Sequence, residues 1–254
     1  MKLVTVGDVM VDVVADQRPA AGERAHGSVR LRAGGSAVNA ALVARELGAD
    51  VQVVGRIGND AAGEVVLSTL DARGIDTGLA RDDELPTGVV VALGNAIVAD
   101  RGANAQLSPG DLPSPLRGDA LLVSGFALFQ DGSREAARAA LDRFEGEWTA
   151  VDLASPRLAT LDFDARVVFA TEDEAKAVPQ LRERFEIVCV KRAGGARVHS
   201  SREVADAASS RVVETTRFGG GDAFAAAFLV ALADGAELAH ALERACAAGA
   251  RAAS

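Results

Sequence analysis

The chain has 254 residues, of which 49% are hydrophobic and 25% are charged, the balance of a globular protein that buries a sizeable core. It contains no apolar run near the ~20 residues of a membrane helix, and its first 16 residues predict a strand rather than a signal peptide. The net charge of −9 argues against a nucleic-acid partner. Together with two cysteines predicted to be small buried hydrophobes, Cys189 and Cys246, these features predict a cytoplasmic protein without a membrane partner.

Short apolar runs alternate along the chain with alanine-rich stretches of helical period. The runs predict strands over residues 2–8, 51–58, 120–126, 149–154, 166–171 and 187–192. The stretches between them predict helices over 36–47, 60–74, 132–144 and 173–185, and two further helices close the chain at about 220–234 and 236–253. This alternation is typical of an α/β fold with a largely parallel sheet.

Two segments, 13–35 and 87–104, interrupt this alternation. Both have the turns and short β runs of hairpins, and they predict a small separate sheet beside the main one. Because no low-complexity linker or internal repeat divides the chain, we expect one domain over 1–254 with a β-rich lid.

The stretch "RFGGGDAFAAAF" (217–228) places three glycines, Gly219, Gly220 and Gly221, and then Asp222 at the start of an apolar helix. Glycine amides at a helix N-terminus form a site for a phosphate or for the charge on a phosphoryl group in transfer. Asp222 would then accept a proton from a hydroxyl that attacks this group. A flexible turn followed by a helix cap explains this stretch alone equally well. It is not a Walker A loop, because no Gly-Lys-Ser/Thr follows.

Two other stretches carry polar groups suited to sugar hydroxyls. Gly34 and Gly35 open a helix that presents Asn39, which a glycine turn with a solvated asparagine would also explain. Asp12 lies in an apolar strand run, where an unpartnered carboxylate is costly to bury. We therefore expect polyol hydroxyls or lid backbone to satisfy Asp12.

These stretches together resemble the ribokinase-like (PfkB family) carbohydrate kinases over nearly the whole chain. "GGSAVNAALVARELGADVQVVGRIGNDAAGE" (34–64) resembles the amino-terminal signature of the family, and "RGANAQLSP" (101–109) resembles its return from lid to core. "GGGDAFAAAFLVAL" (219–232) resembles its carboxy-terminal signature. The resemblance implies a three-layer α/β/α sandwich with a mostly parallel central sheet and a small β lid.

The resemblance also implies a role for each matching residue. Asp222 would be the catalytic base, and the amides of Gly219, Gly220 and Gly221 would form the anion hole. The residues that hold the sugar would be Asp12, Gly34, Gly35 and Asn39. "TEDEA" (171–175) would place Glu174 near Mg²⁺, with Thr171 where the family has asparagine, and "VKRAGG" (190–195) would place Lys191 and Gly194 at the nucleotide.

The chain departs from the family pattern at three further places. Two extra residues separate the threonines at 215–216 from the glycines, which puts Glu214 and a monovalent-cation site in doubt. The nucleotide turn is one residue short. Phe126 falls near the position where ribose-specific relatives carry a sugar-binding acid, so ribose is not favoured.

The leading interpretation is an ATP-dependent sugar kinase that uses Mg²⁺ and a closing lid, with a small sugar and ATP as its partners. The sequence does not determine the oligomeric state, and a homodimer is one possibility. One alternative is a nucleoside kinase of the same fold. Another is a non-catalytic sugar- or nucleotide-binding relative, suggested by Thr171 and by the altered 217–218 segment. A nicotinamide-dependent dehydrogenase does not fit, because no strand is followed by Gly-x-Gly-x-x-Gly.

Overall fold

A nine-stranded sheet forms the centre of the computed structural model, which describes residues 1–93, 96–157, 162–209 and 219–252. Its strand order is β13-β12-β11-β10-β9-β8-β1-β4-β5, and the pairs are parallel from β11 to β5 and antiparallel at β12 and β13. The strands are β1 (Lys2–Val6), β4 (Asp50–Gly58), β5 (Asp76–Asp82), β8 (Ala120–Ser124), β9 (Trp148–Asp152), β10 (Val167–Thr171), β11 (Ile187–Arg192), β12 (Gly195–Ser200) and β13 (Val204–Ala208).

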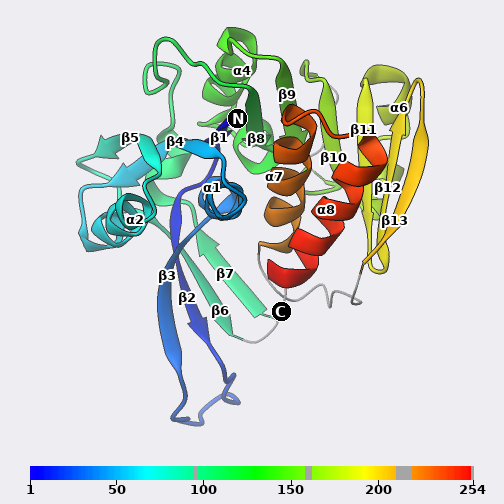
Figure 1. Ribbon diagram of the computed structural model, residues 1–254. Helices are drawn as coiled ribbons and strands as arrows, with labels where there is room; N and C mark the ends of the chain where they lie inside the picture. Colours follow the sequence, from blue (N-terminus) through cyan, green and yellow to red (C-terminus); the bar gives the residue numbers. More distant parts are fainter. Residues whose placement is uncertain (94–95, 158–161, 210–218, 253–254) are drawn as a thin grey trace.

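Helices cover both faces of this sheet and complete a three-layer sandwich (Figure 1). One face packs against α1 (Ser36–Glu46), α2 (Ala61–Ala72), α7 (Gly220–Ala233) and α8 (Leu238–Ala252). The other face packs against α3 (Gly125–Phe129), α4 (Arg134–Arg143), α5 (Glu172–Ala177) and α6 (Leu181–Arg184). None of the described helices has the length and apolar character needed to cross a membrane.

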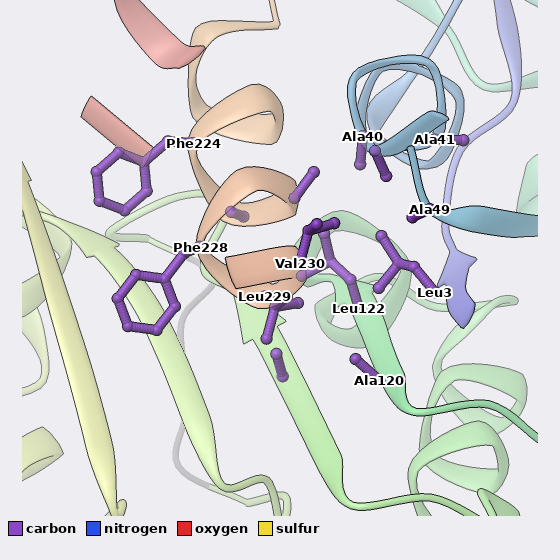
Figure 2. Close-up of a cluster of buried hydrophobic side chains, with 14 of the residues drawn as sticks. Leu3, Ala40, Ala41, Ala49, Ala120, Leu122, Phe224, Phe228, Leu229 and Val230 are labelled. Atoms are coloured by element: carbon purple, nitrogen blue, oxygen red, sulfur yellow. The ribbon is translucent and has the colours of Figure 1, made fainter. Parts of the chain in front are cut away.

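Alternate side chains of each central strand enter different cores. Leu3 and Leu122 face the α1 and α7 side, where Phe228 and small alanines fill the space between helix and sheet (Figure 2). Val4 and Leu121 face the opposite core. Because both faces are covered, these strands are continuously apolar, which explains why the sequence revealed them.

A second, four-stranded sheet with the order β3-β2-β6-β7 extends away from the sandwich (Figure 1). Its strands are β2 (Met10–Ala15), β3 (Val29–Gly34), β6 (Gly88–Leu93) and β7 (Ala96–Asp100). We predicted a single strand for the first apolar run of the chain, and this prediction is wrong. The run forms two strands, β1 and β2, which lie in different sheets.

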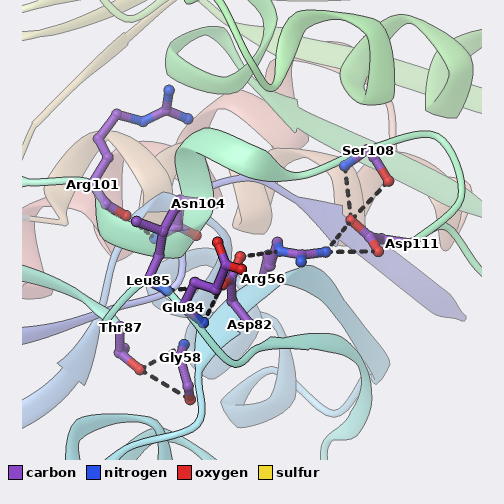
Figure 3. Close-up of polar contacts among 10 residues, drawn as sticks. All are labelled: Arg56, Gly58, Asp82, Glu84, Leu85, Thr87, Arg101, Asn104, Ser108 and Asp111. Carbon is purple, nitrogen blue, oxygen red and sulfur yellow. Dashed lines mark hydrogen bonds and ion pairs between the residues drawn. The ribbon is translucent and has the colours of Figure 1, made fainter.

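Side-chain hydrogen bonds hold the junction between the two sheets. The Asn104 amide accepts from the backbone N–H of Val9 at 2.8 Å and donates to the Val9 carbonyl at 2.9 Å, which fixes the break between β1 and β2. Thr87, just before β6, accepts from the N–H of Gly58 at 3.0 Å, and Arg56 pairs with Asp82 and Asp111 nearby (Figure 3). These contacts anchor the small sheet at its root.

Other differences from the sequence prediction lie at the edges of the fold. The helix expected over 173–185 is interrupted at Pro179 into α5 and α6, because proline cannot donate the helical hydrogen bond. The strands β5, β12 and β13 were not predicted. They are partly exposed and lie at or near the ends of the sheet, so they lack the continuous apolar run of a central strand.

Candidate active site

The glycine run forms the N-terminus of α7, a helix whose following turns are fully buried. Gly219 is the residue before the helix, and its φ of +86° is in the left-handed region that favours glycine. The first helical hydrogen bond runs from the N–H of Ala223 to the carbonyl of Gly219 at 2.8 Å. The amides of Gly220, Gly221 and Asp222 therefore precede the helical ladder and are available to an anion.

Asp222 is the third residue of α7 and lies at this same end. Its Oδ2 accepts a hydrogen bond from the side-chain amide of Asn39, on α1, at 3.1 Å. Burial raises the pKa of Asp222 to about 7, Asp152 adds to the rise, and the Asn39 amide and Lys191 oppose it. A carboxylate with this pKa is suited to accept and release a proton near neutral pH.

A buried ion pair stands beside Asp222. Lys191, on β11, donates from Nζ to Oδ1 of Asp152, at the end of β9, over 2.5 Å, and the two side chains are only 17% and 14% exposed. A Cβ atom on Gly221 would lie 3.3 Å from the Lys191 Nζ, so the ammonium adjoins the first turn of α7. Burial opposes the charge of Lys191, yet Asp152, with Glu174 and Asp222, raises the lysine pKa above its ordinary value. The ammonium is therefore charged.

One cavity, of about 510 Å³, opens between the sandwich and the small sheet. Its polar wall contains Asp12, Asn39, Asp152 and Asp222, with Gly219 beside them. Burial raises the pKa of Asp12, while Arg32, on the neighbouring strand, opposes the rise through a 3.2 Å ion pair. The partner of Asp12 is thus a lid side chain, not the lid backbone that we predicted as one possibility.

A second cavity, of about 460 Å³, lies on the other side of the same helix end. Gly220, Gly221 and Lys191 line it, together with Thr171 at the end of β10 and a wall from α8. The two cavities meet at the first turn of α7, where Asp222 faces one and its neighbouring glycines face the other. Both lie at the carboxyl ends of the parallel strands, where α/β sheets bind ligands.

Thr171 and Glu174 form a capping box at the start of α5. The Thr171 N–H donates to Oε2 of Glu174 at 2.7 Å, and the Glu174 N–H donates to the threonine hydroxyl at 3.3 Å. Glu174 is buried, and this burial raises its pKa against the opposing effects of the Thr171 N–H and Lys191. Thr171 is also opposite Lys191 in the β10–β11 register.

The described residues contain no group of three or more carboxylate, histidine or cysteine ligands that would cage a metal. Mg²⁺ in phosphoryl-transfer sites is commonly held by one or two carboxylates together with substrate phosphates and water. Glu174 lines neither cavity and its Oε2 accepts from the Thr171 N–H, whereas its neighbours Glu172 and Asp173 line the second cavity. A magnesium ion in that cavity would therefore reach Glu174 through its water shell.

Of three further glycines predicted to be in the site, one lines a cavity and two do not. Gly35 lines the first cavity and adopts a φ of +86° against the carbonyl of Asp8. Gly34 does not line it; a side chain there would collide with the Asp12 carboxylate, so this glycine makes room for Asp12. Gly194 lies in the turn between β11 and β12 with open space around it, and its neighbours Ala193 and Gly195 line the second cavity instead.

Asp152 is the site residue that the sequence did not reveal. It lies in an apolar strand run, and its partner Lys191 is 39 positions away. The segment 210–218, with Glu214 and the two extra residues, is outside the described part of the chain.

The comparisons with known proteins agree with one another. The model of the pfkB family of carbohydrate kinases matches residues 1–254. Ribokinase of Bacillus subtilis (strain 168) is 35% identical over 115 residues, which cover 42% of this chain and only 39% of the ribokinase. Fructokinase of Klebsiella pneumoniae is 26% identical over 267 residues, covering 91% of this chain and 84% of the fructokinase. The structure of an Escherichia coli protein in complex with ATP and Mg²⁺ has a TM-score of 0.82 at 20% identity, covering 98% of this chain and 91% of that one.

Proposed function

Because this chain belongs to the PfkB family of carbohydrate kinases, we propose that it transfers the γ-phosphoryl group of ATP to a hydroxyl of a small carbohydrate. The observation that supports this most is the position of Asp222. It faces one cavity at the helix end where neighbouring glycine amides face the other. A phosphoryl donor and a hydroxyl acceptor in these two cavities would meet at the first turn of α7.

In this proposal Asp222 is the base. Asn39 occupies its Oδ2, which leaves Oδ1 to accept the proton of the acceptor hydroxyl. The raised pKa keeps proton affinity high enough for transfer while the carboxylate is still substantially ionised near pH 7. Asp12 and Asn39 bind the other hydroxyls and orient the acceptor.

The amides of Gly219, Gly220 and Gly221 bind the charge that develops on the transferred group. Lys191 adds a full positive charge beside them, and Asp152 holds its ammonium in place through the 2.5 Å contact. Asp152 is therefore a positioning residue in this scheme. It also raises the proton affinity of Asp222 through like-charge repulsion.

Thr171, Lys191 and Gly194 are proposed to bind the nucleotide, Gly194 through its turn rather than by lining the cavity. Glu174 would hold Mg²⁺ through the water shell of the ion, and the bound ion would neutralise phosphate charge. The small sheet would act as the lid that excludes water from the acceptor, with Asp12 on its inner face.

We also propose a homodimer formed through the outer face of the small sheet. A row of apolar side chains crosses that face, Leu31, Val13, Val91 and Val98, in direct register. Leu31 is 66% and Val98 is 72% exposed. An apolar sheet face of this kind is a typical site of association, and a second copy offers a matching surface.

The test of the proposed activity is a panel of acceptors assayed for acceptor-dependent consumption of ATP and for a phosphorylated product. We expect at least one uncharged sugar or sugar-containing compound to be phosphorylated. ATP and acceptor binding without transfer, for every acceptor that binds, would favour the non-catalytic interpretation instead.

A further inference from the structure

The inner face of the small sheet changes in character from one edge to the other. Four residues oppose one another across its strands in direct register: Arg32 on β3, Asp12 on β2, Val90 on β6 and Ala99 on β7. The first two form an ion pair, and the last two are apolar. Ile97 continues the apolar part along β7 and lines the same cavity. The roof of the acceptor cavity is thus charged near Asp12 and apolar over β6 and β7.

An aromatic side chain continues this apolar region on the sandwich side. Phe126 is the second residue of the short helix after β8, and its N–H donates to the Ser124 hydroxyl at 3.2 Å. Its side chain lines the cavity and is 41% exposed, although the rest of α3 is buried. An exposed aromatic in a cavity wall offers a surface that a flat apolar group would cover.

The charges around the cavity favour an acceptor without negative charge. Among the described residues, each cation at or next to the wall already has a carboxylate partner. Arg101 donates to Asp8 from both Nε and Nη2, the latter at 2.7 Å, and also bonds Ser133 and Gln130. Asp222 accepts a hydrogen bond from the neutral side-chain amide of Asn39, and no ion pair of Asp222 is found in the described part of the chain. A phosphate or carboxylate on the acceptor would therefore be repelled by the carboxylates of the cavity wall, and it would find no unpaired cation among the described residues to offset that repulsion.

We infer that the acceptor is an uncharged, nucleoside-like compound, in which a polyol ring is joined to a flat aromatic group. The inference rests on the proposed phosphoryl transfer and specifies its acceptor. The hydroxyls of the ring lie against Asp12, Asn39 and Asp222, and the aromatic group lies between Phe126 and the apolar strands β6 and β7. Phosphorylated sugars and sugar acids are excluded as preferred acceptors.

The experiment measures binding by calorimetry and transfer from ATP for three kinds of probe: inosine and cytidine, free ribose, and ribose 5-phosphate with gluconate. We expect at least one nucleoside to bind about tenfold or more tightly than ribose, the effect of covering an aromatic surface. The anionic probes should bind more weakly than ribose. Ribose binding as tight as nucleoside binding, or preference for an anionic probe, would overturn the inference.

Two pairs of variants separate this specificity from general damage. Phe126→Ala should weaken nucleoside binding about tenfold and leave ribose within about twofold, whereas Val204→Ala, an exposed residue on β13 outside the cavity, should change neither. Ile97→Ala should act like Phe126→Ala, and Leu85→Ala, a partly exposed residue between β5 and β6 outside the cavity, should not. Equal losses for ribose and nucleoside in Phe126→Ala would contradict the assignment.

Failure of this inference differs from failure of the proposed function. Transfer to free sugars that is insensitive to Phe126 would leave the kinase activity standing and remove the nucleoside-like acceptor. Phe126-dependent nucleoside binding without transfer to any probe would support the nucleoside-like ligand and contradict the proposed kinase activity.

Discussion

Asp152→Asn should move the pH dependence of phosphoryl transfer to lower pH. The substitution removes a negative charge that raises the pKa of Asp222, and it leaves the Lys191 ammonium nearby without its anionic partner. Both changes favour the ionised form of Asp222. A like charge at close range commonly alters a carboxyl pKa by roughly one unit or more, so we expect the acidic limb of the profile to fall by about one pH unit.

The effect is largest on the acid side of the profile. Wild-type Asp222, with a pKa of about 7, is only about a tenth ionised at pH 6, and a pKa near 6 would make it about half ionised. The activity at pH 6, as a fraction of the plateau at high pH, should therefore rise about fivefold in Asp152→Asn. The plateau itself should fall, because asparagine holds the lysine less firmly beside the glycine amides.

The assay is kcat/KM for the acceptor from pH 5 to 9 at saturating ATP. Asp234→Asn is the matched control, since it removes a carboxylate at the opposite end of the same helix. Its acidic limb should coincide with that of the wild type. An unchanged limb in Asp152→Asn, or a limb moved to higher pH, would refute the electrostatic coupling between Asp152 and Asp222.

Three other substitutions test separate parts of the account. Asp12→Ala should weaken acceptor binding by about 1–3 kcal/mol and leave ATP binding unchanged in calorimetry, because it removes one buried hydrogen-bonding group from the acceptor cavity alone; equal losses for both ligands would contradict this. Gly221→Ala, whose Cβ would lie 3.3 Å from the Lys191 Nζ, should lower kcat by about tenfold or more, whereas Gly110→Ala, with 3.7 Å to its nearest atom, should not. Leu31→Lys should convert a dimer to a monomer in light scattering by placing a charge in the apolar outer face of the small sheet; an unchanged mass would place any dimer contact elsewhere.

The central strands could be predicted from the sequence because burial on both faces makes them continuously apolar. The outer strands could not, because burial alternates with exposure along them; in β13 Val204 is 60% exposed. The division of the first apolar run into β1 and β2 depends on Asn104, which lies 95 positions from Val9, so no local pattern records it.

The site shows the same distinction. Gly219, Asp222 and Asn39 occur in stretches whose local pattern already suggests chemistry, and the structure brings them together at one helix end. Asp152 occurs in no such stretch, since a single acidic residue at the end of an apolar strand has no distinctive local pattern. Its place beside Lys191 appears only when the parallel register brings the ends of β9 and β11 near each other across β10.

The most direct test of the central claim compares wild-type protein with Asp222→Asn in the transfer of phosphate from ATP, followed by ³¹P NMR of the acceptor product. Asparagine preserves the shape of the side chain but cannot take the proton. The account predicts that the variant binds ATP and acceptor and forms product about 10² to 10⁴ times more slowly. Product formation by Asp222→Asn at a rate near that of the wild type would contradict the assignment of Asp222 as the base.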